Sequence, residues 1–145
     1  FTPKDATLVI DATNAVIGRL SAVVAKRLLE GEKVVIINAE KSVFSGKEKT
    51  VTEVYYRRRG MTQKANPEHA MKWPRRPDFL FKKIVEGMLP KHSNRKTTAM
   101  KTLRVYIGNP ENVEKAVKPV KTSEELGRSF VTLEQICRNL GWNKK

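Results

Sequence analysis

The stretch TLVIDATNAVIGRLSAVVAKRLLEGEKVVIIN, from Thr7 to Asn38, decides the fold of this chain because it holds a complete strand, helix and second strand. Thr7 to Asp11 and Lys33 to Asn38 are β-rich runs, and the second is almost continuously apolar, as in a strand covered on both faces. Asn14 is the expected N-cap of the intervening helix, and Gly31 is its expected left-handed end. This order forms a β-α-β unit, which predicts a parallel pair of strands. One helical face carries apolar residues at three- and four-residue steps: Ile17, Leu20, Val24 and Leu28.

The next part of the chain contains a short strand, a helix and one long loop. Ser42 to Ser45 predicts the strand, and an apolar face from Val51 to Tyr55 predicts a helix that ends at Gly60. Residues 61 to 77 have no periodicity, are basic and contain three prolines. This composition predicts an extended loop that is too long for a simple connection.

Helical periodicity returns after Pro77, which lies in the first turn of the predicted helix, and Pro90 stops that helix. Ser93 is the expected N-cap of a shorter basic helix that runs to about Thr102. Leu103 to Ile107 then predicts another strand, which a Gly-Asn-Pro turn closes.

The C-terminal end predicts one more helix. Thr132 and Gln135 form a capping-box pair, and Gly141 terminates the helical face that follows. The chain shows no internal repeat and no domain boundary. It therefore predicts a single domain, residues 1–145, of the α/β class: a three-layer α/β/α sandwich with a mainly parallel sheet and a basic loop and helix extension.

Positive charge is concentrated in the middle of the chain. The 145 residues have a net charge of +14 and a pI of about 10.1. Residues 55 to 104 hold 14 Lys and Arg against three acids, so this stretch alone has a net charge of +11 and the rest of the chain has +3. Such asymmetry indicates a polyanionic partner rather than an ordinary solvated surface.

Several classes of protein do not fit the sequence. No apolar run approaches the roughly 18 residues of a membrane span, and no secretory signal is visible in the residues given. Cys137 is the only cysteine and cannot form an internal disulfide. His69 and His92 are the only histidines, so we expect no zinc cluster, and a reducing intracellular setting fits best.

The sequence also shows no recognisable enzyme active site. The turn after the first strand has one glycine, Gly18, where a dinucleotide fingerprint needs three, and no Walker-type phosphate loop occurs. Asp11 is the one candidate metal ligand, but the pattern places no second acid near it. We expect its carboxylate to accept hydrogen bonds from backbone amides at the start of the next helix. We therefore predict no catalytic residue, no bound metal and no cofactor.

The basic residues of the central segment form the candidate site. Arginine can bind two phosphate oxygens with its planar fork, whereas each lysine acts as a mobile point charge. These residues are multivalent phosphate ligands of the kind that RNA-binding proteins use. The candidate RNA-binding residues are Arg57, Arg58, Arg59, Lys64, Lys72, Trp73, Arg75, Arg76, Lys82, Lys83, Lys91, His92, Arg95, Lys96 and Lys101.

Trp73 has two possible roles among these cations. In an RNA interface its indole can stack on an unpaired base. Alternatively, it folds back onto the domain and anchors the loop.

Six motifs occur in the order and spacing of a known family, and the similarity covers about residues 8 to 111 and, more loosely, the C-terminus. The chain resembles the large-subunit ribosomal protein L-thirteen family, and the segment from Thr50 to Arg59 is similar to its archaeal-type branch. Lys96 is a departure, because it stands where the family carries a glycine. The motifs are Ile10 to Leu20 (IDATNAVIGRL), Val35 to Lys41 (VIINAEK), Ser45-Gly46, Arg76-Pro77-Asp78, Gly87 to Lys91 (GMLPK) and Val105 to Glu111 (VYIGNPE).

The resemblance implies a four-stranded parallel sheet flanked by helices, no catalysis, and a cytoplasmic place on large-subunit ribosomal RNA from early in assembly. The expected partners are that RNA and neighbouring large-subunit proteins, with no membrane and no small-molecule substrate. The sequence is therefore interpreted as a structural RNA-binding protein whose segment of about residues 57–101 binds RNA by shape and phosphate recognition. The alternatives are a nucleic-acid-processing enzyme that uses Asp11 and a free messenger-RNA-binding translational regulator.

Overall fold

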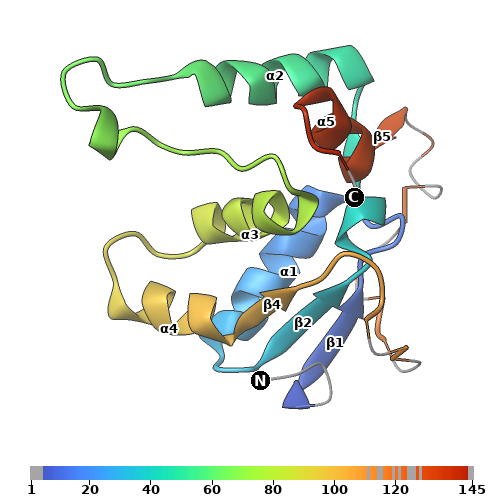
Figure 1. Ribbon diagram of the computed structural model, residues 1–145. Coiled ribbons are helices and arrows are strands. Elements are labelled where there is room, and N and C mark those ends of the chain that lie inside the picture. Colours follow the sequence, from blue (N-terminus) through green and yellow to red (C-terminus); the bar gives the residue numbers. More distant parts are fainter. Residues whose placement is uncertain are drawn as a thin grey trace.

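A computed structural model describes residues 5–110, 112–113, 116–118, 120, 122–123, 127 and 129–143. Strands β1 (Leu8–Asp11), β2 (Val34–Ile37) and β4 (Leu103–Val105) form a parallel sheet in the order β1-β2-β4 (Figure 1). Helix α1 (Ile17–Leu29) connects β1 to β2. Leu8 pairs with Val34, which pairs in turn with Leu103, so the predicted β-α-β unit and its parallel pairing are confirmed.

Helix α1 has the predicted buried stripe and end, but not the predicted start. Its four stripe residues are at most 3% exposed, and Gly31 ends it with φ of +92°. Asn14 is not its N-cap, because Val16 occupies that position and no side chain caps the helix. Asn14 instead adopts φ of +56°, donates its backbone N–H to Lys41 O and accepts from Ser123 N–H. These bonds hold Asn14 in the turn, so the helix begins at Ile17.

Helices α3 (Pro77–Met88) and α4 (Asn94–Thr102) cover the same face of the sheet as α1. Helix α1 packs against both of them, and both contact β4. This shared packing makes one apolar core from three helices and three strands. The core combines sheet and helix residues: Ile10, Ile36, Leu103, Leu20, Val24, Phe81, Val85 and Ala99.

Side-chain caps begin two of the helices, as the sequence predicts. The Ser93 hydroxyl accepts a hydrogen bond from Arg95 N–H at 3.2 Å, where α4 starts. Helix α5 (Leu133–Asn139) begins with the predicted capping box, in which Thr132 and Gln135 each bond the other's backbone N–H. Each cap satisfies N–H groups that have no partner inside the helix.

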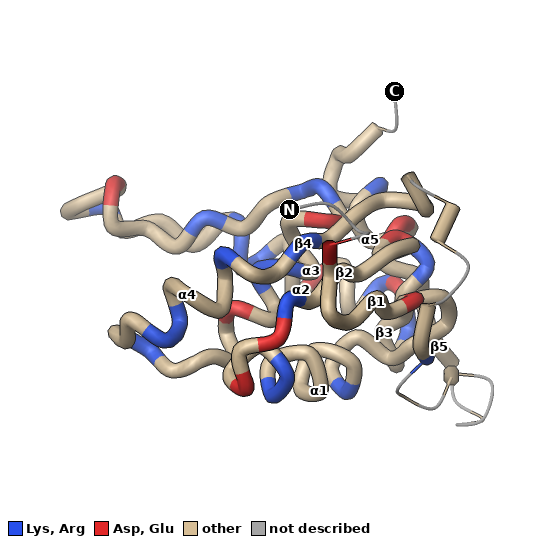
Figure 2. Tube along the Cα trace, turned by 90° about the horizontal axis from the view of Figure 1, so that it is seen from below, with Lys and Arg blue, Asp and Glu red and all other residues tan. Residues whose placement is uncertain are grey.

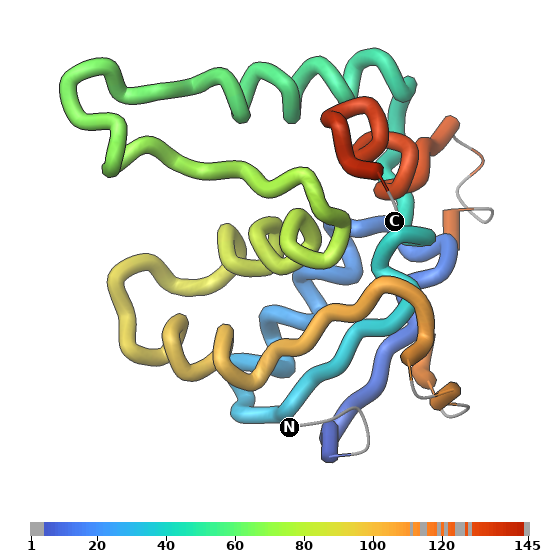
Figure 3. Tube along the Cα trace, viewed as in Figure 1, coloured from blue at the N-terminus to red at the C-terminus, as the bar shows by residue number. Residues whose placement is uncertain are grey.

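A second, antiparallel sheet pairs β3 (Val43–Ser45) with β5 (Phe130–Thr132), and α2 (Glu48–Gly60) packs against α5 (Figure 3). Strand β5 was not predicted, because three residues are too few to show a period of two. The pairing of β5 with β3 brings the C-terminal part of the chain to the start of α2.

The α/β class and the mainly parallel sheet are confirmed, but the expected four strands are not. The described part of the chain has three parallel strands and an isolated bridge between Ile10 and Val117 beside β1. Of the predicted three layers, the described part of the chain shows the sheet and one helical layer, because α2 and α5 lie beyond the carboxyl ends of the strands (Figure 1). Of the predicted apolar face of α2, Tyr55 is buried and Val51 is partly buried, whereas Val54 is 39% exposed, so this face is too narrow to cover a sheet. Among the described helices, none is long and apolar enough to span a membrane.

Asp11 joins β1 to the turn that follows it and to β2. Its Oδ1 accepts hydrogen bonds from Thr13 N–H at 3.1 Å, the Thr13 hydroxyl at 2.7 Å and Asn38 Nδ2 at 3.0 Å. Lys118 Nζ lies 3.8 Å from Oδ2. Burial acts to raise the pKa of Asp11, but the bonds from Thr13 and Asn38 outweigh it and lower the pKa below 3.8. Asp11 therefore accepts one backbone amide as expected, but that amide belongs to Thr13 in the turn rather than to the start of α1, and its other donors are side chains.

Asp11→Asn should lower the free energy of unfolding at pH 7 by about 1 kcal/mol, because it removes the charge but keeps an acceptor. A lowered folded pKa means that the contribution of Asp11 is complete above its unfolded pKa, near 3.8, and is lost as the pH falls through the folded value. The gap between wild type and variant in urea denaturation should therefore narrow from pH 5 to pH 3. Glu68→Gln, which removes an exposed carboxylate of the short helix η3 (Pro67–His69), is the control and should open no such gap. A gap for Asp11→Asn that is constant with pH would contradict the role of the charge.

Candidate nucleic-acid interface

Two basic segments project from the same end of the molecule. One is the arm, residues 61–76, which leaves α2 and returns to α3; the other is the α3–α4 turn, residues 89–93 (Figures 1 and 3). Every residue from 61 to 69 is exposed. Lys and Arg recur along the arm and along α4, with isolated acidic positions among them (Figure 2). The fold thus brings the cations of the arm close to Lys91 and His92 of the α3–α4 turn.

The part of the arm that returns toward α3 is fixed to α2 by Trp73. The indole meets the ring of Tyr55 edge to face, with centroids 5.8 Å apart. The Arg58 guanidinium lies over both rings, 5.1 Å from the Trp73 centroid and 5.2 Å from that of Tyr55. Arg59 donates a hydrogen bond to the carbonyl of Trp73. Tyr55 is 6% exposed and contacts Phe44, so these contacts connect the arm to the body of the domain.

This arrangement corresponds to the loop-anchor role of Trp73. The indole is partly buried against the core, and its neighbours come from its own chain. Cation–ring contacts that are partly removed from water are worth about 1 kcal/mol or more, and an edge-to-face aromatic pair adds a similar amount. Arg58 and Arg59, predicted as phosphate ligands, here position the arm.

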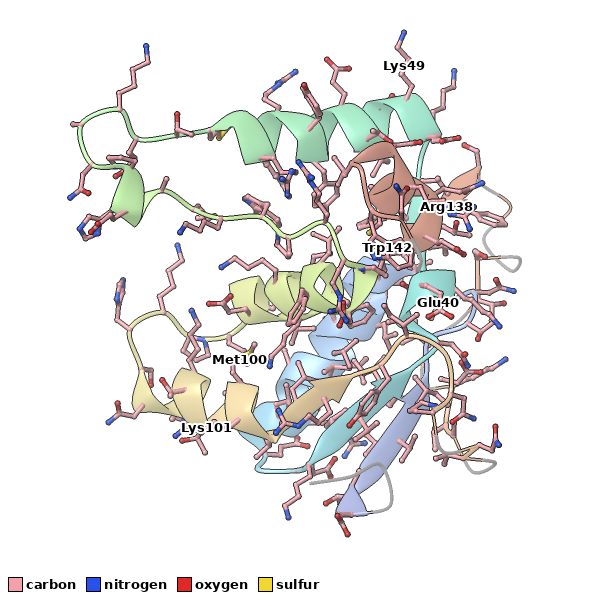
Figure 4. The ribbon with its side chains drawn as sticks, viewed as in Figure 1. Glu40, Lys49, Met100, Lys101, Arg138 and Trp142 are labelled. Atoms are coloured by element: carbon pink, nitrogen blue, oxygen red, sulfur yellow. The ribbon has the colours of Figure 1, made fainter. Side chains whose placement is uncertain are left out.

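A basic cleft of about 730 Å³ lies between α3 and α4. Met100 and Lys101, in the last turn of α4, line this cleft (Figure 4). Glu86 is the only carboxylate among the described residues that line it. The cationic and potentially cationic lining residues are Lys82, His92, Lys96, Lys101 and Arg104.

Glu86 connects α3 to α4 at the edge of this cleft. Its carboxylate lies 2.9 Å from the Nζ of Lys83 and 2.9 Å from that of Lys96. Hydrogen bonds from Lys96 and Lys83 lower the pKa of Glu86. The charges of Lys83 and Lys96, both predicted phosphate ligands, are therefore compensated by Glu86. The contact between Glu86 and Lys96 stabilises the position of α4 against α3.

The remaining candidates divide into paired and unpaired cations. Arg57 lies 3.6 Å from Glu53, and Arg76 makes a two-point contact with Asp78 at 2.8 and 3.2 Å. His92 is exposed in the α3–α4 turn with φ of +54°. Within the described ranges, seven candidate side chains form no ion pair: Lys64, Lys72, Arg75, Lys82, Lys91, Arg95 and Lys101.

The sequence analysis did not identify two charged residues of the cleft, Arg104 and Glu86, as part of the site. Arg104 lies in β4, and the alternation of buried Leu103 with exposed Arg104 is the signal that could have identified it. Glu86 was counted only as an acid, because its i, i+3 spacing to Lys83 does not reveal the contact with Lys96 on another helix.

The other chemically reactive groups are placed in structural roles. The carboxylate of Asp11 is engaged by Thr13 and Asn38, and no three His, Cys, Asp or Glu side chains in the described ranges gather as a metal site. Cys137 lies in the core, where burial raises its pKa to about 12 and keeps the thiol protonated.

The fold and this surface together define a class: a small, basic α/β protein in which two projecting segments gather positive charge at one end. A sequence profile of the family described as Ribosomal protein L13 matches residues 5–112. The chain belongs to this family, which confirms the resemblance seen in its motifs. Family membership also confirms the prediction that it is not an enzyme.

Archaeal relatives cover nearly the whole chain. It is 43% identical to the large ribosomal subunit protein uL13 of Methanopyrus kandleri, over 92% of this chain and 86% of the relative. It is 36% identical to the protein of that name from Haloarcula marismortui, over 97% and 94% of the two chains. For the Methanocaldococcus jannaschii protein the identity is 37%, over 92% and 96%. These relatives agree with the predicted archaeal-type branch.

Trp73→Ala should lower the free energy of unfolding by about 1–3 kcal/mol, because it removes a partly buried ring and its contacts with Tyr55 and Arg58. The freed arm should also be cut faster by trypsin at Lys64 and Lys72. Met71→Ala is the matched control, since Met71 lies in the same arm but is 63% exposed. Unchanged stability together with weaker RNA binding would instead support the base-stacking role.

Proposed function

We propose that the chain is a structural component of the large ribosomal subunit and that its basic segment, residues 57–101, binds and stabilises large-subunit ribosomal RNA. The observation that carries this proposal is the gathering of unpaired cations on the arm, the cleft and the α3–α4 turn, at one end of the molecule. A surface that served only for solubility would not need its charge on projecting segments. The relatives are named as proteins of the large ribosomal subunit, and these names support that particle as the place where the chain binds RNA.

The mode of recognition follows from the geometry of the cations. Lys82 and Lys101 border one cleft, whereas Lys64 and Lys72 lie on the arm. Side chains cannot read base edges in the deep, narrow major groove of an RNA helix, so a surface of this kind selects RNA by fitting phosphates at fixed separations. The anchored arm and the Glu86 contacts keep those separations defined before RNA binds.

The same surface favours binding early in assembly. Phosphates that approach one another in folded RNA repel, and cations placed between them reduce that cost. The protein therefore acts while the RNA of the large subunit is still compacting. As a large-subunit component, it does so in the cytoplasm. Neighbouring large-subunit proteins are its further partners.

Co-sedimentation tests the role directly. The native protein should travel with large subunits through a sucrose gradient and should remain there after a wash at moderate salt. Recovery in the light fractions, bound to messenger RNA or free, would overturn the proposal and favour the regulator.

Binding to protein-free large-subunit RNA should depend steeply on salt. About 6 to 10 neutralised phosphates predict a slope of roughly −4 to −9 in a plot of log K against log salt concentration. Filter binding at several salt concentrations measures this slope. A slope near −1 would contradict an interface built on phosphate contacts.

Charge reversal at the cleft should weaken this binding more than charge reversal elsewhere. Lys82→Glu with Lys101→Glu removes two cleft cations and should make the slope less negative by about 2. The matched control is Arg19→Glu with Lys26→Glu, on the exposed side of α1, which changes net charge equally. Equal losses from both pairs would show that net charge alone drives binding.

A further inference from the structure

Phe79 occupies an unusual position on α3. The core side of this helix is marked by the buried residues Phe81 and Val85. At about 100° per residue, Phe79 lies about 160° around the helix from Phe81, on the side that also carries Glu86. Phe79 is 51% exposed. A large aromatic ring thus lies in the middle of the solvent-facing side of an amphipathic helix, away from the core.

The ring has a guanidinium stacked on it. Arg76 lies with its guanidinium carbon 4.9 Å from the centroid of Phe79. Asp78 accepts from Arg76 Nε at 3.2 Å and from Nη2 at 2.8 Å, and this two-point contact fixes the orientation of the planar group. Arg76 and Phe79 therefore form a preorganised pair of planar groups at the surface.

Trp73 and Phe79 differ in what surrounds them. The indole of Trp73 is partly buried and is contacted by Tyr55 and Arg58. Phe79 has Arg76 on its ring but remains half exposed, so a further planar group can reach it. Trp73, the aromatic residue that the sequence analysis proposed for base stacking, is engaged by its own chain, whereas Phe79 is accessible.

Phe79 has an unpaired cation beside it. Lys82 follows it by one helical turn, forms no ion pair within the described ranges and continues into the basic cleft, whereas Lys83 on the same turn is held by Glu86. Phosphates on either side of a base bound at Phe79 would meet this charge. A purely apolar protein partner would leave the cation without a countercharge, and an acidic one would leave the ring without a planar group to stack on it.

We propose that Phe79 and Arg76 form a stacking site for one unpaired base of the ribosomal RNA. This inference rests on the proposed function and adds a base contact to a surface otherwise made of phosphate contacts. An unpaired base can stack on an aromatic ring and on the plane of a guanidinium whatever its identity. The site therefore selects an unpaired nucleotide next to a phosphate cluster rather than a particular base.

The test compares three variants with the wild-type protein for binding to protein-free large-subunit RNA. Phe79→Leu keeps an apolar side chain but loses the flat ring, and its affinity should fall about tenfold. Phe79→Trp keeps a flat ring and should bind as tightly as wild type, with tryptophan fluorescence that changes on RNA addition. Phe130→Leu is the control, because Phe130 is 46% exposed on β5, outside the basic segment.

Salt dependence separates stacking from charge. Because Phe79→Leu removes no cation, its slope against salt should equal that of wild type while the affinity is lower at every salt concentration. Its melting temperature should also be unchanged, since the ring is half exposed.

Three outcomes would overturn the stacking site. Wild-type affinity for Phe79→Leu would show that no base contacts the ring, and failure of Phe79→Trp to restore affinity would show that the flat ring is not what matters. Normal RNA binding combined with poor incorporation of Phe79→Leu into subunits would assign Phe79 to a protein contact. In each case the steep slope of the wild type would still support RNA binding, whereas a shallow wild-type slope would overturn the proposed function itself.

Discussion

Coverage of one face of the parallel sheet by α1, α3 and α4 is the constraint on which the rest of the structure depends. Helices α1 and α3 turn their apolar stripes toward Ile10, Ile36 and Leu103, and α4 adds Ala99 to the same core. Their polar sides then have to face outward, and for α3 and α4 those sides border a common cleft. The basic surface is therefore a consequence of how the core is closed.

A segment with a net charge of +11 repels itself, and the structure shows how that repulsion is limited. Each of its few acids within the α-helices has a structural contact: Asp78 holds Arg76, and Glu86 holds Lys83 and Lys96. Arg58 is placed over the rings of Tyr55 and Trp73. The segment can thus be both strongly basic and ordered, with only part of its charge left for a partner.

Local pattern was enough to predict most of the elements. The stripe of α1, the cap at Ser93 and the capping box at Thr132 were confirmed, because each depends on residues within four positions of one another. The predicted N-cap of α1 was wrong, because the backbone of Asn14 is hydrogen-bonded to Lys41 and Ser123 from distant parts of the chain. Strand β5 exists only because β3 lies beside it.

The sequence by itself determined the α/β class, the parallel β1–β2 pair and the location of the charge, because periodicity and composition are properties of consecutive residues. Only the tertiary structure decided which cations remain unpaired, that Trp73 packs against Tyr55, and that Phe79 faces solvent with Arg76 on its ring. Those outcomes depend on side chains from separate elements meeting at a few ångströms. Such distances are set by how the helices pack on the sheet, and no local pattern in the chain records them.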